Sequence, residues 1–486
     1  MPTPQPDFPM DLIDPKHHRQ LFLDDHAIES MDGVRRRLRK PDRCGPVIPG
    51  AGVQSRSTPI WNPEKALWEW WYFGRNCCYA TSEDGEHWEQ PILGLFEVDG
   101  SRDNNVACDP TQGARSVFHI VRDDRDPDVS RRYKALFGSD GRQLGTSSDG
   151  FEWTLLDEVI PSQDESQFTY DPISEHFLAL VKHPTEWGRS VWLSTSVEFG
   201  DFSEPELIFH ADETDWENCR RRVREIVDNP AYLTPPIVDD VDYFAQIYNM
   251  AVLPYQGFYI GFATVFNPIG AIPPPATNYT RINQIELTVS RDLKNWERVA
   301  DREVFLGVEP WTGDNYACSQ LLPSGAPVVR EDGEIWCYYN ALRMPGSREQ
   351  YRDFNRRKEL FRLGVSPEAF DDSAALSLAK LPSDRFVALE ADEAGQVQTK
   401  PFELKGEEVY INAAAPWGKV FVEIVDAESS KAHEGFWVPG EEPEPFVGDE
   451  LRARVEWKPK HDRVFDRPVR LRFYLHQARL YSFWIE

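Results

Sequence analysis

A short motif recurs along the first three quarters of the chain and constrains the fold more than any other feature of the sequence. It consists of a strand-like segment, a turn related to Ser-x-Asp-Gly, and then a large aromatic residue. Clear copies are Tyr79–Trp88 (YATSEDGEHW), Leu144–Trp153, Leu193–Phe202 and Leu287–Trp296, with a weak fifth copy at Leu363–Asp372. Asp and Gly supply the local hydrogen bonds and the positive φ that a tight turn needs. One such unit cannot bury both of its faces, whereas several arranged radially can.

An alternating apolar strand precedes each copy of the motif. These strands are Ala66–Gly74, Arg131–Ser139, His176–His183, Gly257–Phe266 and Glu334–Leu342. Amphipathic helices are scarce, and the best candidate is a single insertion at Glu217–Val227. A large β-sandwich would have no reason to repeat the motif. The sequence therefore predicts an all-β fold with a five-bladed β-propeller over residues 1–375.

The repeat fades near Leu376, and a different pattern follows. From Asp384 onwards the chain shows evenly spaced alternating strands without helices. This pattern predicts a second domain, a small jelly-roll-like β-sandwich over residues 376–486. Two domains also suit a chain of 486 residues.

The charge of the chain excludes several classes of function. With 53 basic and 81 acidic residues, the formal net charge is -28. Such a surface repels nucleic acids and anionic membranes, so neither is expected as a partner. The seven cysteines show no CxxC pair, and no Cys/His spacing indicates a metal site. The N-terminal residues lack the features of a signal peptide, which predicts a cytoplasmic protein.

The order of these segments resembles a known group of proteins. LFLDDHAIE (Leu21–Glu29), the repeated motif, and the terminal KPFELKGEEVYINAAA and PVRLRFYLHQARLYSF are similar to a group of bacterial proteins. That group is placed with the five-bladed propeller glycoside hydrolases, the superfamily of families 32, 43 and 68. The resemblance implies a glycosidase-like scaffold.

The sequence departs from that superfamily in its catalytic motifs. Family 32 enzymes carry WxNDPNG, RDP and EC motifs, and none of them is recognisable here. The letters RDP occur within Asp124–Val129, at a turn between predicted strands. The site must therefore be located from position in the fold, because fold alone does not fix function.

Candidate site residues lie where each innermost strand of a propeller begins, since side chains from different blades converge there. Glycoside hydrolysis needs two carboxyl groups that flank one glycosidic bond, and amides and aromatic rings bind the sugar. The residues at these positions are Arg56 in blade one, Asn105 in blade two, Asp164, Glu165 and Gln167 in blade three, Asp242, Gln246 and Tyr248 in blade four, and Asp314 in blade five. The alternative interpretation is that these acids cap turns in an acidic chain.

Roles follow partly from the resemblance. It implies that blade three supplies the general acid, which is Asp164. Asp314 and Asp242 are then candidates for the base or nucleophile and the transition-state stabiliser. Asp25 is either an early catalytic base or part of a structural N-terminal strand. Trp187 and Trp311 lie in predicted loops and are candidates for stacking on a sugar.

The predicted function is a glycoside hydrolase that cleaves a terminal or small sugar unit with paired carboxylates. No cofactor is expected, although a carboxylate-rich propeller could bind calcium without an EF-hand loop. Two alternatives stay open. One is a non-catalytic carbohydrate-binding propeller, and the other is an inverting glycoside phosphorylase, in which Arg56, Arg189 and Arg343 would bind phosphate.

Overall fold

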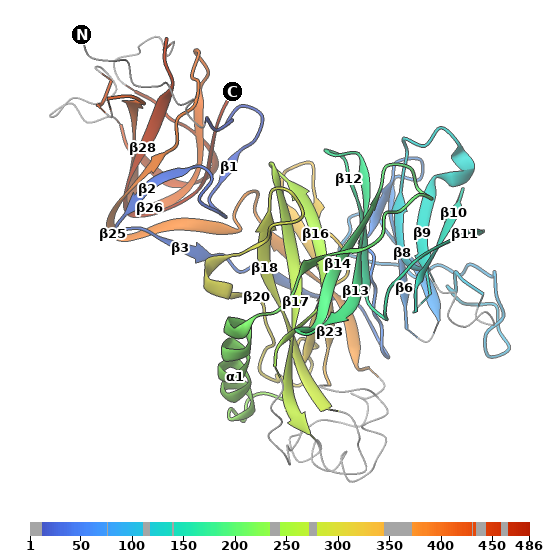
Figure 1. The fold of residues 1–486 in the computed structure, drawn as a ribbon. Coiled ribbons are helices and arrows are strands. Elements are labelled where there is room, and N and C mark those ends of the chain that lie inside the picture. The colour runs from blue at the N-terminus through green and yellow to red at the C-terminus, as the bar shows by residue number, and fades with distance from the viewer. Residues whose placement is uncertain are drawn as a thin grey trace. The chain divides into compact units, whose positions relative to one another are not determined.

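The chain divides into two compact units, each described here by itself (Figure 1). The computed structural model describes residues 12–74, 76–109, 117–138, 140–233, 244–271, 279–344, 372–429, 431–433, 444–457 and 465–486. Unit 1 comprises residues 1–40, 297–303 and 381–486, and unit 2 comprises residues 41–296 and 304–380. Strands dominate both units, so the predicted all-β class is confirmed.

The described strands of unit 2 form five antiparallel groups in chain order. The first group is β5 (Ile60–Asn62), β6 (Leu67–Phe73) and β7 (Cys77–Ser82), and the second is β8 (Val117–Arg122), β9 (Tyr133–Phe137), β10 (Arg142–Ser147) and β11 (Thr154–Ile160), with a short 3-10 turn at Val129–Arg131. The third is β12 (Ser166–Asp171), β13 (His176–Thr185), β14 (Gly188–Ser196) and β15 (Glu206–Phe209).

The last two groups share one continuous sheet. The fourth group is β16 (Gln246–Tyr255), β17 (Phe258–Ala271), β18 (Tyr279–Ser290) and β20 (Val304–Leu306), and the fifth is β21 (Gln320–Pro323), β22 (Val328–Val329), β23 (Ile335–Leu342), β24 (Ala374–Leu381) and β4 (Asp42–Gly50). A single parallel pairing, Asn283 with Gln320, joins them. Because β4 pairs with β24, the start of unit 2 completes its last group. The five-bladed count stays a prediction that these five groups fit.

The repeated motif forms the same turn in successive groups. In the first copy Ser82 Oγ donates to Asp84 Oδ1 (3.1 Å), and the Gly85 backbone NH donates to Ser82 Oγ (2.8 Å). Gly85 has φ of +84°, and a Cβ there would lie 2.8 Å from Trp336 in the fifth group. This copy thus needs glycine both for its φ and because the next sheet packs directly on it, whereas the fourth copy has Leu293 at the same place with φ of +64°. The contact with Trp336 also joins the first group to the fifth.

The predicted helical insertion is confirmed and begins earlier than expected. Helix α1 spans Glu213–Val227, and Asp212 caps it in a reciprocal pair of hydrogen bonds with Asp215. Arg222 of α1 forms a buried ion pair with Glu286 of β18. The helix is therefore fixed to the fourth group (Figure 1).

Unit 1 is one mixed-length sheet around a single apolar core. The strands of this sheet are β1 (Gln20–Leu21), β2 (Ile28–Asp32), β3 (Arg35–Leu38), β25 (Val387–Thr399), β26 (Val409–Asp426), β27 (Phe446–Arg454) and β28 (Val469–Ile485). Unit 1 also includes residues 297–303, whose β19 (Glu297–Arg298) is not part of this sheet and whose 3-10 turn lies at Ala300–Arg302. The N-terminal strands, which the sequence assigned to the propeller, pair instead with β25 and β28. Phe22 and Ile28 belong to the same core as Phe473 and Phe483, and burial of these side chains explains the pairing.

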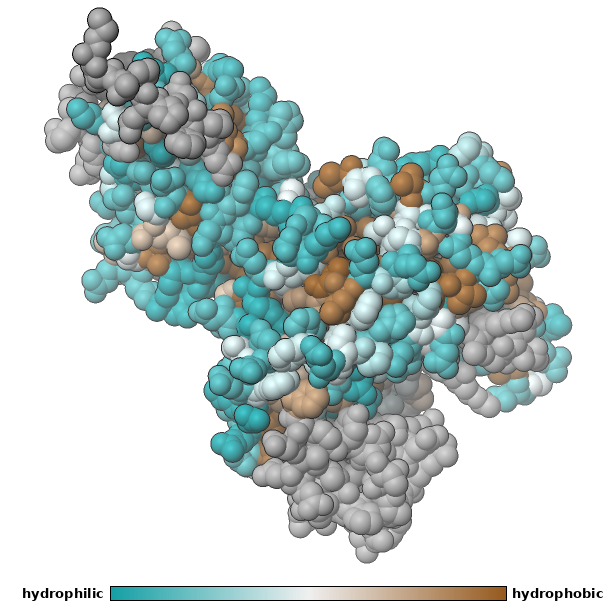
Figure 2. All heavy atoms as spheres, in the orientation of Figure 1, coloured by the Kyte–Doolittle hydropathy of each residue, from teal (hydrophilic) through white to brown (hydrophobic). Residues whose placement is uncertain are grey.

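The surface of the described residues is mostly hydrophilic on one face of the molecule (Figure 2). On the face drawn in Figure 2, hydrophilic residues cover most of both units, and apolar residues form only scattered patches. Large isolated apolar residues on a surface are ordinary and need no partner.

Candidate functional site

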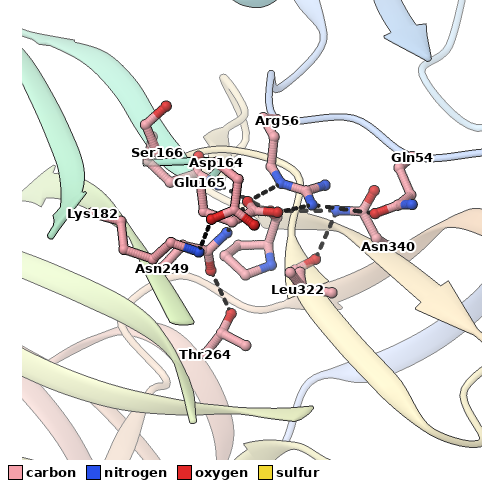
Figure 3. A network of polar contacts seen from close by, with 12 residues as sticks. Gln54, Arg56, Asp164, Glu165, Ser166, Lys182, Asn249, Thr264, Leu322 and Asn340 are labelled. Atoms are coloured by element: carbon pink, nitrogen blue, oxygen red, sulfur yellow. Dashed lines mark hydrogen bonds and ion pairs between the residues drawn. The ribbon is translucent and has the colours of Figure 1, made fainter. Parts of the chain in front are cut away.

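Side chains from all five groups of unit 2 meet in one hydrogen-bonded and charged network (Figure 3). We call the charged and aromatic part of this network the central cluster. The central cluster consists of Arg56, Asp164, Glu165, Lys182, Arg189, Gln246, Tyr248, Asn249, Phe266 and Arg281. The structure thus brings together Arg56, Asp164, Glu165, Gln246 and Tyr248 as predicted from their places at strand beginnings.

A buried ion pair between Arg56 and Glu165 forms the base of the central cluster. Arg56 Nε donates to Glu165 Oε2 (2.5 Å), and its NH2 donates to Glu165 Oε1 (2.6 Å). The two side chains are only 4% and 7% exposed. Burial, the largest single effect, lowers the pKa of Arg56, but the charge and the hydrogen bonds of Glu165, with smaller effects of Tyr248 and Asp164, together raise it above its ordinary value. Two parallel charge-assisted hydrogen bonds hold these two side chains rigidly together.

A short chain of hydrogen bonds extends this pair to the fourth group. Asn249 Nδ2 donates to Glu165 Oε2 (3.3 Å), and Thr264 Oγ1 donates to Asn249 Oδ1 (2.6 Å). Both oxygens of Glu165 are therefore occupied by hydrogen bonds (Figure 3). A carboxylate held in this way positions its neighbours and is poorly placed to exchange protons.

Asp164, the residue before Glu165, has the opposite environment. Its side chain is 63% exposed, while its ion-pair partner Lys182 is 3% exposed (Figure 3). Partial burial, the largest single effect, raises the pKa of Asp164, but the charge and hydrogen bond of Lys182 together with the charge of Arg189 and a backbone hydrogen bond lower it below its ordinary value. The carboxyl is therefore ionised at neutral pH. A lowered pKa is the opposite of what a general acid requires.

Two stacked aromatic rings lie beside this carboxylate, and cationic side chains lie over the faces of the rings. Tyr248 and Phe266 stack with their centroids 6.0 Å apart. Lys182 Nζ lies 4.3 Å from the Tyr248 centroid, and Arg189 Cζ lies 4.7 Å from that of Phe266. Burial first, and then the charge of Glu165, raises the pKa of Tyr248, so its phenol stays protonated. The contacts are those of cation–π pairs.

A second part of the network, the buried layer, lies around His119, Ser166 and Arg142. His119 contacts the Arg56 carbonyl through Nδ1 (2.6 Å) and Ser166 Oγ through Nε2 (2.7 Å), while Arg142 Nε donates to the same Oγ (2.5 Å). Burial first, and then the charge of Arg142, lowers the pKa of His119 well below its usual range. The histidine is thus neutral, with Nδ1 donating to the carbonyl.

Gln167 belongs to this buried layer rather than to the central cluster. Its Nε2 donates to the carbonyl of Pro323 in the fifth group (3.2 Å), and the residue is buried. Asn340 Nδ2 likewise donates to the carbonyls of Ser55 (3.0 Å) and Leu322 (3.1 Å). These two amides link inner strands of different groups through hydrogen bonds to backbone carbonyls.

The position predicted for Asn105 is wrong. Residues 104–107 do not begin the second group; they pair with the outer side of β7, and β8 is the inner strand. The Asn105 amide donates to the Tyr72 hydroxyl (2.9 Å) and to the Tyr79 carbonyl (2.8 Å). These two hydrogen bonds fix its side chain at the edge of the first group.

Asp314 and the two candidate tryptophans lie outside the central cluster. Asp314 is exposed and accepts a hydrogen bond from Thr312 Oγ1 (2.9 Å). Trp311 is half-buried, 5.8 Å from the guanidinium carbon of Arg343. Trp187 packs on His210, with ring centroids 5.3 Å apart.

Two predicted acids, Asp25 and Asp242, are not found in the central cluster among the described residues. Asp25 belongs to unit 1, where its exposed carboxylate pairs with Arg36 between β1 and β2. This contact agrees with the structural alternative for the N-terminal strand. Asp242 lies outside the described residues.

Neither a metal site nor a membrane span is found in the part of the chain that the structure describes. No group of three or more His, Cys, Asp or Glu side chains there could hold a metal ion. No described helix is both long enough and apolar enough to cross a bilayer.

Sequence reasoning missed Lys182, Asn249 and Arg281. Lys182 stands in the run FLALVK, where every other side chain is apolar, and Arg281 opens the alternating run RINQIEL. A charged residue in an otherwise buried strand is a signal for a buried partner. The signal shows that a partner exists but does not identify it.

Comparison with known proteins gives distant structural likenesses only. No family model and no curated protein matches the chain. An exo-β-1,3-galactanase from Phanerochaete chrysosporium, bound to galactose, is 8% identical over 91% of this chain and 100% of that one, with a TM-score of 0.37. The catalytic domain of a family 62 α-L-arabinofuranosidase from Coprinopsis cinerea is 12% identical over 71% and 97%, with a TM-score of 0.38.

A third likeness includes both hydrolases and phosphorylases. It comes from glycoside hydrolase family 130, mannoside phosphorylases among which are hydrolases that target β-1,2-mannosidic linkages in Candida mannan. That structure is 10% identical over 73% of this chain and 95% of its own, with a TM-score of 0.36. All three likenesses are distant, so the chemistry of this site has to follow from its own residues.

Proposed function

We propose that unit 2 is a glycoside hydrolase that cleaves a terminal or small sugar unit at the central cluster, with Asp164 as its working carboxylate. The observation that carries this proposal is the contrast between the exposed Asp164 carboxylate and the buried Lys182 that holds its charge. A charged group that solvent can reach, held by a buried partner and surrounded by amide and aromatic side chains from several groups of strands, is a candidate site for a ligand.

The role of Asp164 follows from its charge. Glycoside hydrolysis uses one carboxyl that protonates the leaving oxygen and one carboxylate that activates water or attacks the anomeric carbon. An ionised Asp164 has no proton to donate, so we assign it the second role rather than that of the acid. The acid is proposed to be Asp242, which precedes Gln246 in the chain.

The other residues of the central cluster bind or position. Gln246 and Tyr248 offer an amide and a phenol to sugar hydroxyls beside Asp164. Glu165 and Arg56 hold Asn249 and the beginning of β12 in place. Neither residue of this buried pair is assigned a proton-transfer step.

The test is a panel of aryl glycosides and oligosaccharides, assayed with and without phosphate. Asp164→Asn is expected to lower kcat/KM by about 10²–10⁴-fold, the usual contribution of a positioned base. Asp314→Asn is the matched control, because among the described residues its exposed carboxylate accepts a side-chain hydrogen bond only from Thr312. A similar loss in Asp242→Asn would support the assigned acid.

The alternatives give different results in the same panel. Turnover that requires phosphate would identify a phosphorylase, a reading favoured by the Lys182 and Arg189 cations beside Asp164. Sugar binding without turnover would identify a binding protein. Full activity in Asp164→Asn would contradict the proposed site.

A further inference from the structure

Arg281 is a guanidinium whose terminal nitrogens have no carboxylate partner in the described part of the chain. Its Nε donates to Gln320 Oε1 (2.9 Å), and Asn283 Nδ2 donates to the same oxygen (3.4 Å). No hydrogen bond or ion pair of its NH1 or NH2 is found among the described residues. Gln320 is itself buried and held by the Met344 carbonyl (3.2 Å), so it fixes the guanidinium plane.

Arg281 lies on the same aromatic pair as the cations of the proposed catalytic site. Its Cζ is 5.8 Å from the Phe266 centroid, while that of Arg189 is 4.7 Å from it. Lys182 lies over the adjoining Tyr248 ring. The charge of Arg281 acts on the Tyr248 phenol, and that of Arg189 acts on Asp164. Three cations from β13, β14 and β18 therefore surround one aromatic pair.

The charges of the central cluster do not balance. Arg56, Lys182, Arg189 and Arg281 supply four positive charges, and Asp164 and Glu165 supply two negative charges. Among these described residues the positive charges thus outnumber the negative ones, although the whole chain has a net charge of -28. Like charges that gather away from bulk solvent repel each other, and a bound anion relieves that repulsion.

A second observation points to a ligand at this place. Asn283, the cross-strand partner of Phe266, is fully buried, and its Oδ1 has no hydrogen-bond partner in the described residues. A buried carbonyl oxygen without a donor costs free energy unless a hydroxyl or water reaches it. A sugar hydroxyl next to an acidic group would supply that donor.

We infer that Arg281, together with Lys182 and Arg189, forms an oxyanion subsite, so that the ligand of the central cluster carries a negative group beside its sugar ring. The free fork of Arg281 suits a planar carboxylate or one edge of a phosphate, which it can bind with two parallel hydrogen bonds. The group belongs either to the sugar itself, as a uronate, or to free phosphate. The sugar part of this inference rests on the proposed function, whereas the anion part does not.

The experiment measures binding to the full chain by titration calorimetry at low ionic strength. The probes are D-glucuronate and D-galacturonate, their neutral counterparts D-glucose and D-galactose, and inorganic phosphate. At least one anion is expected to bind about tenfold or more tightly than the matching neutral sugar, the usual effect of one charged hydrogen bond.

Two variants and one control locate the subsite. Arg281→Gln is expected to remove that preference, and Arg281→Lys to keep part of it, since it retains the charge but loses the fork. Arg291→Gln is the control, because Arg291 follows the same strand but lies over Phe258 on the surface (3.9 Å). A thermal melt of each variant establishes that it is folded.

The outcomes separate this inference from the proposed function. Arg281-dependent anion binding without turnover of any glycoside would support the subsite and contradict the hydrolase. Turnover of uronides without phosphate would place the anion on the sugar, and turnover that needs phosphate would make phosphate the source. If no anion binds better than its neutral counterpart, or if Arg281→Gln binds as wild type does, the inference is wrong.

Discussion

Replacing Arg56 with methionine should destabilise unit 2 far more than removing a surface ion pair. The variant loses both hydrogen bonds to Glu165 and leaves that carboxylate 7% exposed, with Asn249 Nδ2 at 3.3 Å as its remaining side-chain donor. Removing one partner of a buried pair costs about 3–5 kcal/mol, and the charges of Lys182 and Arg142, which also act on Glu165, place the loss towards the lower end of that range. The expected loss of unfolding free energy for Arg56→Met lies in that range.

The double variant Arg56→Met/Glu165→Met distinguishes this cause from a loss of packing. It removes the stranded charge together with its partner, so it should be more stable than Arg56→Met alone by about 2 kcal/mol or more. Arg452→Met is the surface control, since the Arg452–Glu486 pair is 54% and 47% exposed and should contribute about 0–1 kcal/mol.

The assay is urea unfolding followed by tryptophan fluorescence, with the pH lowered in a second series. Protonation of the stranded carboxyl removes its charge, so the deficit of Arg56→Met should shrink as the pH falls. The reasoning is refuted if Arg56→Met costs no more than Arg452→Met, or if the double variant is as unstable as the single one.

Three further predictions concern other parts of the chain. Gly150→Ala should cost about 2–4 kcal/mol in unfolding free energy, because its φ is +83° and a Cβ there would lie 2.4 Å from Trp71. The control is Gly94→Ala, which should cost about 1 kcal/mol, because φ is +66° there and a Cβ would meet no atom within 4 Å. Equal losses in the two variants would count against the packing argument. Asp164 has a lowered folded-state pKa, so its contribution to stability is present above the ordinary pKa of 3.8 and is lost as the pH falls through the lower value; Asp164→Asn should therefore flatten the pH dependence of unfolding at the acid end, and an unchanged slope would argue against it. The Cys77 and Cys108 sulfurs lie 2.7 Å apart, so oxidised glutathione should take up two electrons and two protons from the two thiols and leave a disulfide; intact mass would show the loss of two hydrogens, absent in Cys108→Ser, and full alkylation after oxidation would contradict this.

The repeated motif allowed the fold class to be predicted because its information is local. Ser82, Asp84 and Gly85 form their turn through hydrogen bonds within a few residues, and the same residue types recur in the later copies. Residues 104–107 were misplaced because an alternating segment looks the same on the inner and the outer edge of a sheet. The strand partner decides between them, and β7 lies far enough back in the sequence that no pattern identifies it.

The candidate site could be predicted only in part, because its contacts join distant residues. Arg56 and Glu165 are 109 positions apart, and no spacing rule relates them. Their position at strand beginnings was enough to place both residues near the centre, but it gave no pairing. Arg281 was missed because it lies within a strand, where it reaches the centre from the side of β18 rather than from an inner strand.

The different environments of Asp164 and Glu165 show why one acid of an adjacent pair can be reactive and the other structural. Asp164 lies in a bend just before β12, and its side chain takes a different direction from that of Glu165. Glu165 turns inward to Arg56, and Asp164 turns outward to solvent while Lys182 reaches it from the interior. Exchanging the two side chains, as Asp164→Glu/Glu165→Asp, would keep the composition and the charge. It would leave the shorter carboxylate to span the distance to Arg56, so the paired hydrogen bonds at 2.5 and 2.6 Å could not both form without movement of β12. The position of Asp164 beside Tyr248 thus depends on the length of the glutamate that follows it.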